Sequence, residues 1–185
     1  MPERTDESLV EAALTGDDGA FAALVNRHKR RVFRLAGRFT RSEHELDDLS
    51  QEVFIKAYEH LAQFRSEAPF EHWLSRIAVR TCYDALRKQR REKRDLPLDD
   101  LTREIRDRRC DEQLSAAEAR SVLAWALGRM TPEERLVITL LELEEKTVRE
   151  VAELTGWSQA NVKVRAWRAR RALKKILEAN HENRW

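Results

Sequence analysis

Apolar residues recur along this chain at intervals of three and four, which is the spacing of one face of an α-helix. In the first half the pattern predicts four helices, over residues 9–13, 18–35, 43–61 and 70–88. Their starts carry helix-capping residues: Asp17 or Asp18 precedes the second helix, Ser42 the third, and Pro69 lies at the first turn of the fourth. The apolar positions of the second helix include Val32 and Phe33.

The same spacing returns in the second half and predicts helices over residues 114–127, from 132 onward, 147–154 and 159–179. Thr131 is a cap, with Pro132 and Glu134 behind it at the first and third positions. Residues 94–112 are highly charged, contain a proline and lack a sustained apolar face, so they are predicted to form a linker. The expected fold is all-α: two small helical domains, 1–93 and 113–185, joined by this flexible charged linker.

Composition supports helices and shows where charge gathers. Charged residues make up 37% of the chain, with only 5 Gly and 4 Pro, a balance that favours helices with wide solvated faces over sheets. The net charge of +2 conceals an asymmetry, because residues 1–62 carry 12 Asp and Glu against 9 Lys and Arg, whereas residues 158–185 carry 8 Lys and Arg against 2 Asp and Glu. A basic C-terminal end is expected of a nucleic-acid contact.

Other features argue against several classes of protein. Cys82 and Cys110 lie far apart without CxxC spacing, so neither a disulfide framework nor a zinc site is expected, and a reducing cytoplasm fits them. The five histidines show no metal-ligand spacing, and no metal or cofactor is predicted. The N-terminus lacks a signal-peptide core, and no apolar run approaches the roughly 18–20 residues that span a bilayer, so no membrane insertion is expected.

Residues 147–162 have the pattern of a helix-turn-helix. Ala152 is small where two helices would cross, Gly156 suits a turn with positive φ, and Ser158 can cap the second helix. That second helix continues through residues 163–175 with seven cations and no acid. A DNA recognition helix needs short polar side chains at its start and cations behind them, although a solvated basic helix face would show a similar charge run.

The fourth helix and the segment before it suggest a second nucleic-acid contact. Phe64 and Phe70 flank a short polar segment, and the helix carries cations on one side; aromatic rings among arginines suit single-stranded DNA. The alternative is that these residues serve the domain's own structure. For Phe70 and Trp73 a core position is favoured outright. For Tyr83, Arg76 and Arg80 both interpretations stay open.

An acidic and polar face lies on the third helix, opposite Leu49 and Val53. Its members are Asp47, Asp48, Gln51 and Glu52. Three interpretations are open: ordinary solvated surface, a docking face for a basic partner helix, or a carboxylate metal site of a nuclease. The last is weakest, because no third ligand comes from another segment.

These segments together resemble the extracytoplasmic-function (ECF) sigma factors, subunits of bacterial RNA polymerase within the sigma-70 superfamily. Residues 47–58, DDLSQEVFIKAY, are similar to the polymerase-binding part of region two, and residues 64–87 to the part that melts and reads the minus-ten element. The segment MTPEER at 130–135 and the helix-turn-helix are similar to region four. The resemblance covers nearly the whole chain, and its segments occur in the family's order. No region-three domain is expected, because residues 94–112 are too short and too polar to form one.

The resemblance implies a promoter-selecting subunit without catalysis, located in the cytoplasm. It implies that Asp47, Asp48, Gln51 and Glu52 bind the clamp helices of the largest polymerase subunit, and that region four rests on the flap of the second-largest. The opened minus-ten strand would contact Phe64, Arg65, Ser66, Arg76, Arg80, Tyr83 and Arg87. The minus-thirty-five duplex would contact Ser158, Gln159, Asn161, Lys163, Arg165 and Arg168. An anti-sigma partner is a further expectation.

The chain departs from many family members at Arg80, where asparagine is common, and at Pro69, where glycine or serine occurs; both changes bear on base preference. Two other classes of function remain as alternatives on the sequence alone. One is a stand-alone helix-turn-helix regulator, which binds an operator without polymerase. The other is a nuclease that uses Asp47, Asp48 and Glu52 with magnesium.

Overall fold

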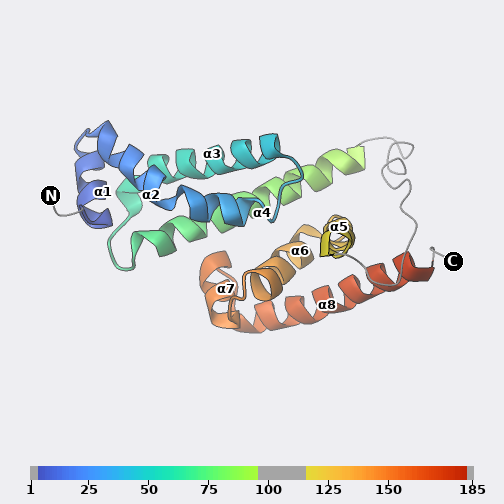
Figure 1. The fold of residues 1–185 in the computed structure, drawn as a ribbon. Coiled ribbons are helices and arrows are strands. Elements are labelled where there is room, and N and C mark those ends of the chain that lie inside the picture. Colours follow the sequence, from blue (N-terminus) through green and yellow to red (C-terminus); the bar gives the residue numbers. More distant parts are fainter. Residues whose placement is uncertain (1–3, 96–115, 183–185) are drawn as a thin grey trace. The chain divides into compact units, whose positions relative to one another are not determined.

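Helices account for all the regular structure in the part of the chain that the computed structural model describes, residues 4–95 and 116–182, as the sequence predicts. The helices of the first half are α1 (Asp6–Leu14), α2 (Asp18–Ala36), α3 (Glu43–Glu59), the 3-10 turn η1 (Leu61–Gln63) and α4 (Phe70–Asp95) (Figure 1). Those of the second half are α5 (Ala116–Leu127), α6 (Pro132–Ile138), the π-helical segment η3 (Thr139–Leu143), α7 (Val148–Thr155) and α8 (Gln159–Glu182). Helix α4 runs through the first two residues of the predicted linker, and the rest of that linker lies outside the described residues.

Most predicted helix starts are capped by the expected side chain. Asp17 caps α2 by accepting the Ala20 N–H at 3.1 Å, and Ser42 caps α3 by accepting the Glu45 N–H at 3.2 Å. Thr131 forms a reciprocal capping box with Glu134, with proline at the first position of α6. Each such cap satisfies backbone donors that the helix itself leaves unpaired.

The chain divides into two compact units, and helices α1 to α4 supply most of the first. Helix α2 packs against α1 and α3, and α1 lies at one end of the longer helices (Figure 1). Their shared core holds aliphatic side chains together with Phe70 of α4, as follows: Leu9, Val10, Leu24, Val32, Val53, Leu61, Phe70 and Leu74. Cys82 is also fully buried. Burying an apolar side chain of this size stabilises the folded state by roughly 1.5–3 kcal/mol.

The second unit is built around α8, which packs against α6 and α5. Buried members of its core include Leu127, Met130, Ile138 and Ala169. Ala169 is fully buried, so a small residue lies where α8 approaches its neighbours. The long helix is therefore held along its inner side, which leaves the opposite side to solvent.

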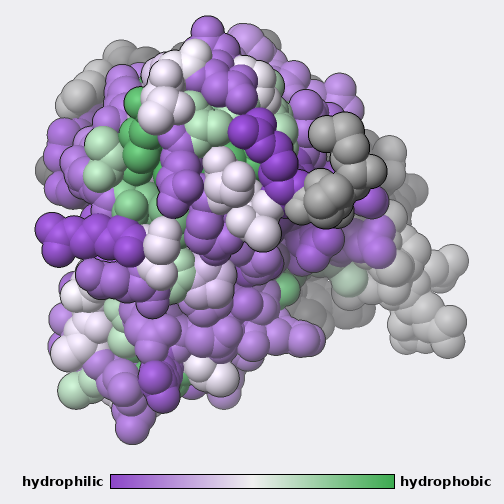
Figure 2. Space-filling model, turned by 90° about the vertical axis from the view of Figure 1, so that its left-hand side faces the viewer, coloured by the Kyte–Doolittle hydropathy of each residue, from purple (hydrophilic) through white to green (hydrophobic). Residues whose placement is uncertain are grey.

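Polar residues cover most of the surface seen in Figure 2, and apolar residues are confined to small areas. None of the helices in the described ranges has the length and apolar character needed to cross a membrane.

Candidate functional site

The acidic face predicted on the third helix is exposed. Helix α3 buries Leu49 and Val53, and this places Asp47, Asp48, Gln51 and Glu52 in solvent. Two of the carboxylates have local partners: Glu52 pairs with Lys56 at 2.8 Å, and Asp48 lies 3.7 Å from the His44 ring nitrogen. Pairs this exposed contribute little to stability, so both carboxylates remain available to a partner.

Two apolar side chains extend this face, and the sequence analysis did not single them out. Ile55 is 50% exposed and Tyr58 52% exposed, one and two helical turns beyond the acids. The Tyr58 ring meets the Phe21 ring edge-on at 4.9 Å between centroids, which fixes its direction. We name the six residues Asp47, Asp48, Gln51, Glu52, Ile55 and Tyr58 the α3 face. Apolar residues at an otherwise polar surface are typical of a binding site.

The segment before α4 is supported by an aromatic cluster. Phe64, Phe70 and Trp73 contact one another with ring centroids 5.4–5.6 Å apart, and His28 of α2 packs on Phe70 at 5.3 Å. Phe70 is buried and Trp73 is partly buried against the core, which agrees with their core assignment. Phe64 belongs to the same cluster, so most of its ring is committed to packing.

The segment between η1 and α4 also carries exposed polar residues. Arg65 and Ser66 are exposed, and Ser66 has a φ of 55°, an uncommon conformation for a residue with a side chain. On α4, Arg76, Arg80 and Arg87 are exposed, whereas Tyr83 is half-buried. The structure therefore presents exposed cations along α4, and the aromatic cluster lies at the start of this helix.

The helix-turn-helix forms as the sequence predicts. Gly156 has a φ of 78° in the turn, and Ser158 caps α8 by accepting the Asn161 N–H at 3.2 Å. Val151 of α7 and Val162 of α8 are both fully buried. The start of α7 has a capping box that the sequence analysis did not identify: Thr147 Oγ1 accepts the Glu150 N–H, and Glu150 accepts the Thr147 N–H at 2.8 Å.

These hydrogen bonds also fix the charge of Glu150. The Thr147 backbone N–H and then the Thr147 hydroxyl lower the pKa of the Glu150 carboxyl from its usual 4.5; partial burial opposes them, and Lys146 adds to the lowering. The carboxylate stays ionised at the N-terminus of α7, where a negative charge is favourable.

Half of the predicted minus-thirty-five residues are occupied within the protein. The Ser158 hydroxyl is engaged in capping, and Asn161 Oδ1 accepts a hydrogen bond from Arg165 Nε at 2.6 Å. The Arg165 guanidinium also lies over the Trp157 ring, 4.2 Å from its centroid. By contrast, Gln159, Lys163 and Arg168 are exposed.

The outer side of α8 has two further residues that the sequence analysis missed. Val164 is 49% exposed and Trp167 58% exposed, and the Arg171 guanidinium lies 4.8 Å from the Trp167 ring centroid. Their positions opposite the buried Val162, Ala166 and Ala169 could have been inferred from the helical spacing alone. We name Gln159, Lys163, Val164, Trp167 and Arg168 the α8 outer face.

The described ranges bring no three His, Cys, Asp or Glu side chains together in the way a metal ion requires.

Comparison with known proteins places both halves of the chain. Residues 24–92 match the family described as Sigma-70 region 2, and residues 122–173 match Sigma-70 region 4. The fold and both matched segments are thus those of a sigma-70 type transcription initiation protein.

Curated relatives narrow the class. The ECF RNA polymerase sigma factor SigM of Mycobacterium tuberculosis H37Rv is 31% identical, with 95% of this chain and 86% of the relative covered. The ECF RNA polymerase sigma-E factor of Escherichia coli K12 is 33% identical, with 91% and 92% covered. The chain belongs to the ECF sigma factors of RNA polymerase.

Solved structures share the fold of this chain. CnrH, determined in complex with the cytosolic domain of CnrY, is 28% identical, with a TM-score of 0.60 and coverage of 94% of this chain and 97% of CnrH. The sigma factor RpoE of Bartonella quintana, determined with the anti-sigma factor NepR, shares the fold at 20% identity, with a TM-score of 0.58 and coverage of 85% and 96%.

Proposed function

We propose that this ECF sigma factor binds core RNA polymerase through the α3 face and selects promoters through two DNA contacts, one on α4 and one on the α8 outer face. The observation that carries the proposal is that the two family regions occur in order and that each presents an exposed surface of suitable chemistry. The α3 face offers carboxylates beside apolar side chains, a combination that suits a basic helical partner such as the clamp helices of the largest subunit. Region four would rest on the flap of the second-largest subunit.

The opened minus-ten strand would lie along α4. Arg76, Arg80 and Arg87 supply cations for its phosphates, and Arg65, Ser66 and the polar edge of Tyr83 lie beside extruded bases. Because the Phe64 ring packs on Phe70 and Trp73, we assign Phe64 to holding this segment in position. The free energy of base pairing that is lost when the duplex opens would be offset by stacking of the extruded bases on the protein and by binding of the phosphates to the α4 arginines.

The minus-thirty-five duplex would receive α8. Gln159 and Lys163 reach base edges, and Arg168 reaches phosphate. Val164 and Trp167 contribute apolar contact with thymine methyl groups. Ser158, Asn161 and Arg165, which bond within the protein, would set the position of the helix and shape its start.

Both contacts act together once polymerase fixes the distance between them, because the second contact is then effectively intramolecular. A cytoplasmic location beside the polymerase follows from this role. Control by an anti-sigma partner is part of the proposal, and the complex of RpoE with NepR is the precedent among proteins of this fold.

Run-off transcription with purified core polymerase and a genomic promoter library tests the function and reports the promoter motif. The chain should direct initiation from a defined set of promoters. Transcription that is no different from core polymerase alone would contradict the proposal.

The α3 face is tested by charge reversal. The pair Asp48→Lys and Glu52→Lys should weaken binding to core polymerase by more than tenfold, measured by fluorescence titration, because repulsion replaces attraction at the interface. The matched control is Glu11→Lys with Glu92→Lys, two exposed acids on other helices that undergo the same change in net charge. Equal affinity for the test pair and the control pair would refute the assignment.

The two alternatives have simple tests of their own. A stand-alone regulator would shift a specific operator fragment in a gel without polymerase. A nuclease would cleave labelled DNA in the presence of magnesium.

A further inference from the structure

A second basic segment lies in the first half of the chain, although that half carries net negative charge over its first 62 residues. Residues 19–42 contain seven arginine and lysine residues and no aspartate or glutamate. Most of this segment is helix α2, which none of the proposed DNA contacts uses.

Some of these cations are engaged inside the domain. Arg27 pairs with Asp6 at 2.6 Å, and Arg31 pairs with Glu71 of α4. Lys29 donates to the Asn26 side chain at 3.1 Å. These groups have identifiable structural roles.

Arg30 and Arg34 have none. They lie one helical turn apart on α2, on the side opposite the buried Leu24, Val32 and Ala36, and both are exposed. Neither side chain makes an ion pair or a hydrogen bond with another group in the described ranges. Two arginines that balance no internal charge are available to an anion outside the domain.

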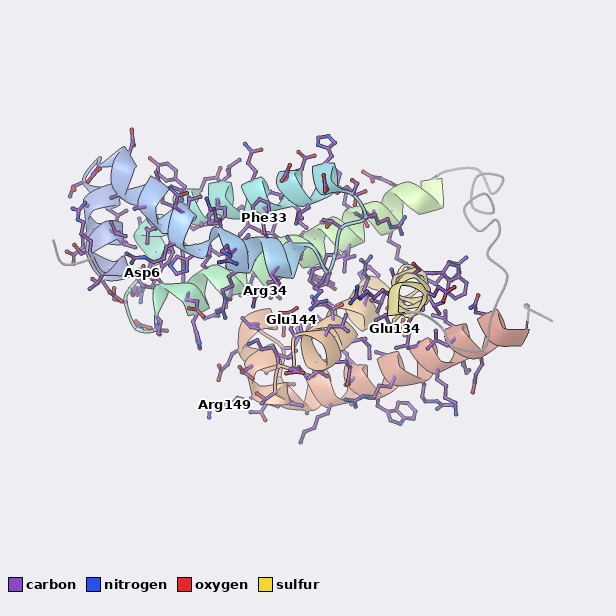
Figure 3. All side chains as sticks on the ribbon, viewed as in Figure 1. Asp6, Phe33, Arg34, Glu134, Glu144 and Arg149 are labelled. Atoms are coloured by element: carbon purple, nitrogen blue, oxygen red, sulfur yellow. The ribbon has the colours of Figure 1, made fainter. Side chains whose placement is uncertain are left out.

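An aromatic ring accompanies them. Phe33 is 38% exposed, although its place in the apolar pattern predicts a core residue. Figure 3 labels Phe33 and Arg34 on α2. Helix geometry places Arg30, Phe33 and Arg34 on adjoining parts of the outer surface, since positions three and four apart are neighbours. We name these three residues the α2 outer face.

We infer that the α2 outer face is an additional contact for single-stranded nucleic acid. Arginines separated by one turn suit successive phosphates, and an exposed ring beside them suits a base, which stacks without regard to its identity. An acidic protein segment would satisfy the arginines but would not need the ring. The inference goes beyond the proposed function, because it concerns a helix outside the promoter-reading surfaces and needs no polymerase.

The test measures binding of the full-length chain to a fluorescein-labelled oligothymidylate by anisotropy, over a range of salt concentrations. The pair Arg30→Ala and Arg34→Ala should reduce the slope of log affinity against log salt by about 1.4, since each phosphate contact on a single strand contributes about 0.7. Phe33→Ala should weaken binding by about tenfold at fixed salt.

Matched controls separate this effect from total charge. Arg120→Ala with Arg149→Ala removes the same charge from exposed positions on other helices, and Leu14→Ala removes another exposed apolar side chain. Both should leave the slope and the affinity unchanged. Thermal unfolding of every variant checks that the fold is intact.

Three outcomes would overturn the inference: no binding of the natural chain at low salt, a test pair that behaves like its control, or a silent Phe33→Ala with equal competition by polyglutamate. The last result would assign the face to an acidic protein partner. Arg80→Ala, measured in parallel, reports on the proposed α4 contact alone, so failure of one assignment is distinguishable from failure of the other.

Discussion

At Gly156 the chain turns between the two helices of the helix-turn-helix with a φ of 78°. A side chain in this conformation brings Cβ close to the following carbonyl oxygen. We expect Gly156→Ala to destabilise the fold by roughly 1–2 kcal/mol, measured by urea unfolding. Gly156→Asn is the matched control and should cost less, because asparagine tolerates this region; equal losses for the two variants would point to a cause other than backbone strain.

Trp167 presents a different case, because its ring is 58% exposed and contributes little to the core. Trp167→Ala should change the free energy of unfolding by less than about 0.5 kcal/mol. The same change should weaken holoenzyme binding to promoter duplex by about tenfold, since apolar contact with the groove is lost. Trp167→Phe should retain most of the affinity. A Trp167→Ala variant with natural promoter affinity would exclude the ring from the interface.

Individual side chains were predicted well where their role is local. The caps at Ser42, Thr131 and Ser158 and the glycine turn depend on a few neighbouring residues, and the sequence contains those neighbours. The contact of Arg165 with Trp157 could not be predicted, because the basic run at residues 163–175 fits a side chain in solvent as well as one in contact with DNA. Its contact depends on where the Trp157 ring lies after the turn has formed.

At the level of elements, the start of α7 should be sensitive to acid. The lowered pKa of Glu150 means that the folded state favours the carboxylate, so this stabilisation is present above the pKa of the unfolded chain and is lost as the pH falls through the lower folded value. Glu150→Gln should therefore cost less than about 0.5 kcal/mol at neutral pH, because the carboxylate is exposed and glutamine can still accept the Thr147 N–H, and the difference from the natural chain should vanish in strong acid. Urea unfolding across pH checks this, with Glu153→Gln on the same helix as a comparison. A difference that is independent of pH would contradict the capping role.

The spacing of apolar residues predicted where the α-helices are, but it did not predict the local departures from α-helical geometry. The π-helical segment at Thr139–Leu143 and the 3-10 turn at Leu61–Gln63 have sequences that suit an ordinary helix. Helix α4 also continues past the point where its apolar stripe fades, because charged residues with good helix propensity extend it to Asp95. Periodicity reports the buried side of a helix, and it says little about a solvated end.

For the whole molecule, the proposed two-contact mechanism predicts how salt affects promoter binding by the holoenzyme. Arg168→Ala removes one duplex phosphate contact and should reduce the salt slope by about 0.9, whereas Arg80→Ala removes a single-strand contact and should reduce it by about 0.7. The double variant should lose about 1.6, because contacts on separate domains add. Footprint titrations at several salt concentrations measure these slopes. A double variant no worse than either single variant would mean that the two arginines do not bind DNA independently.

The internal bonding at the start of α8 has a practical consequence for reprogramming. Ser158, Asn161 and Arg165 make their contacts within α8 and the turn before it, so the residues that shape the start of the helix are separate from the residues proposed to meet bases. Diversity confined to Gln159, Lys163, Val164 and Trp167 would therefore explore new promoter preferences on an unchanged scaffold. Synthetic gene circuits need sigma factors that do not recognise one another's promoters. Such variants would differ in promoter sequence preference and would share one fold.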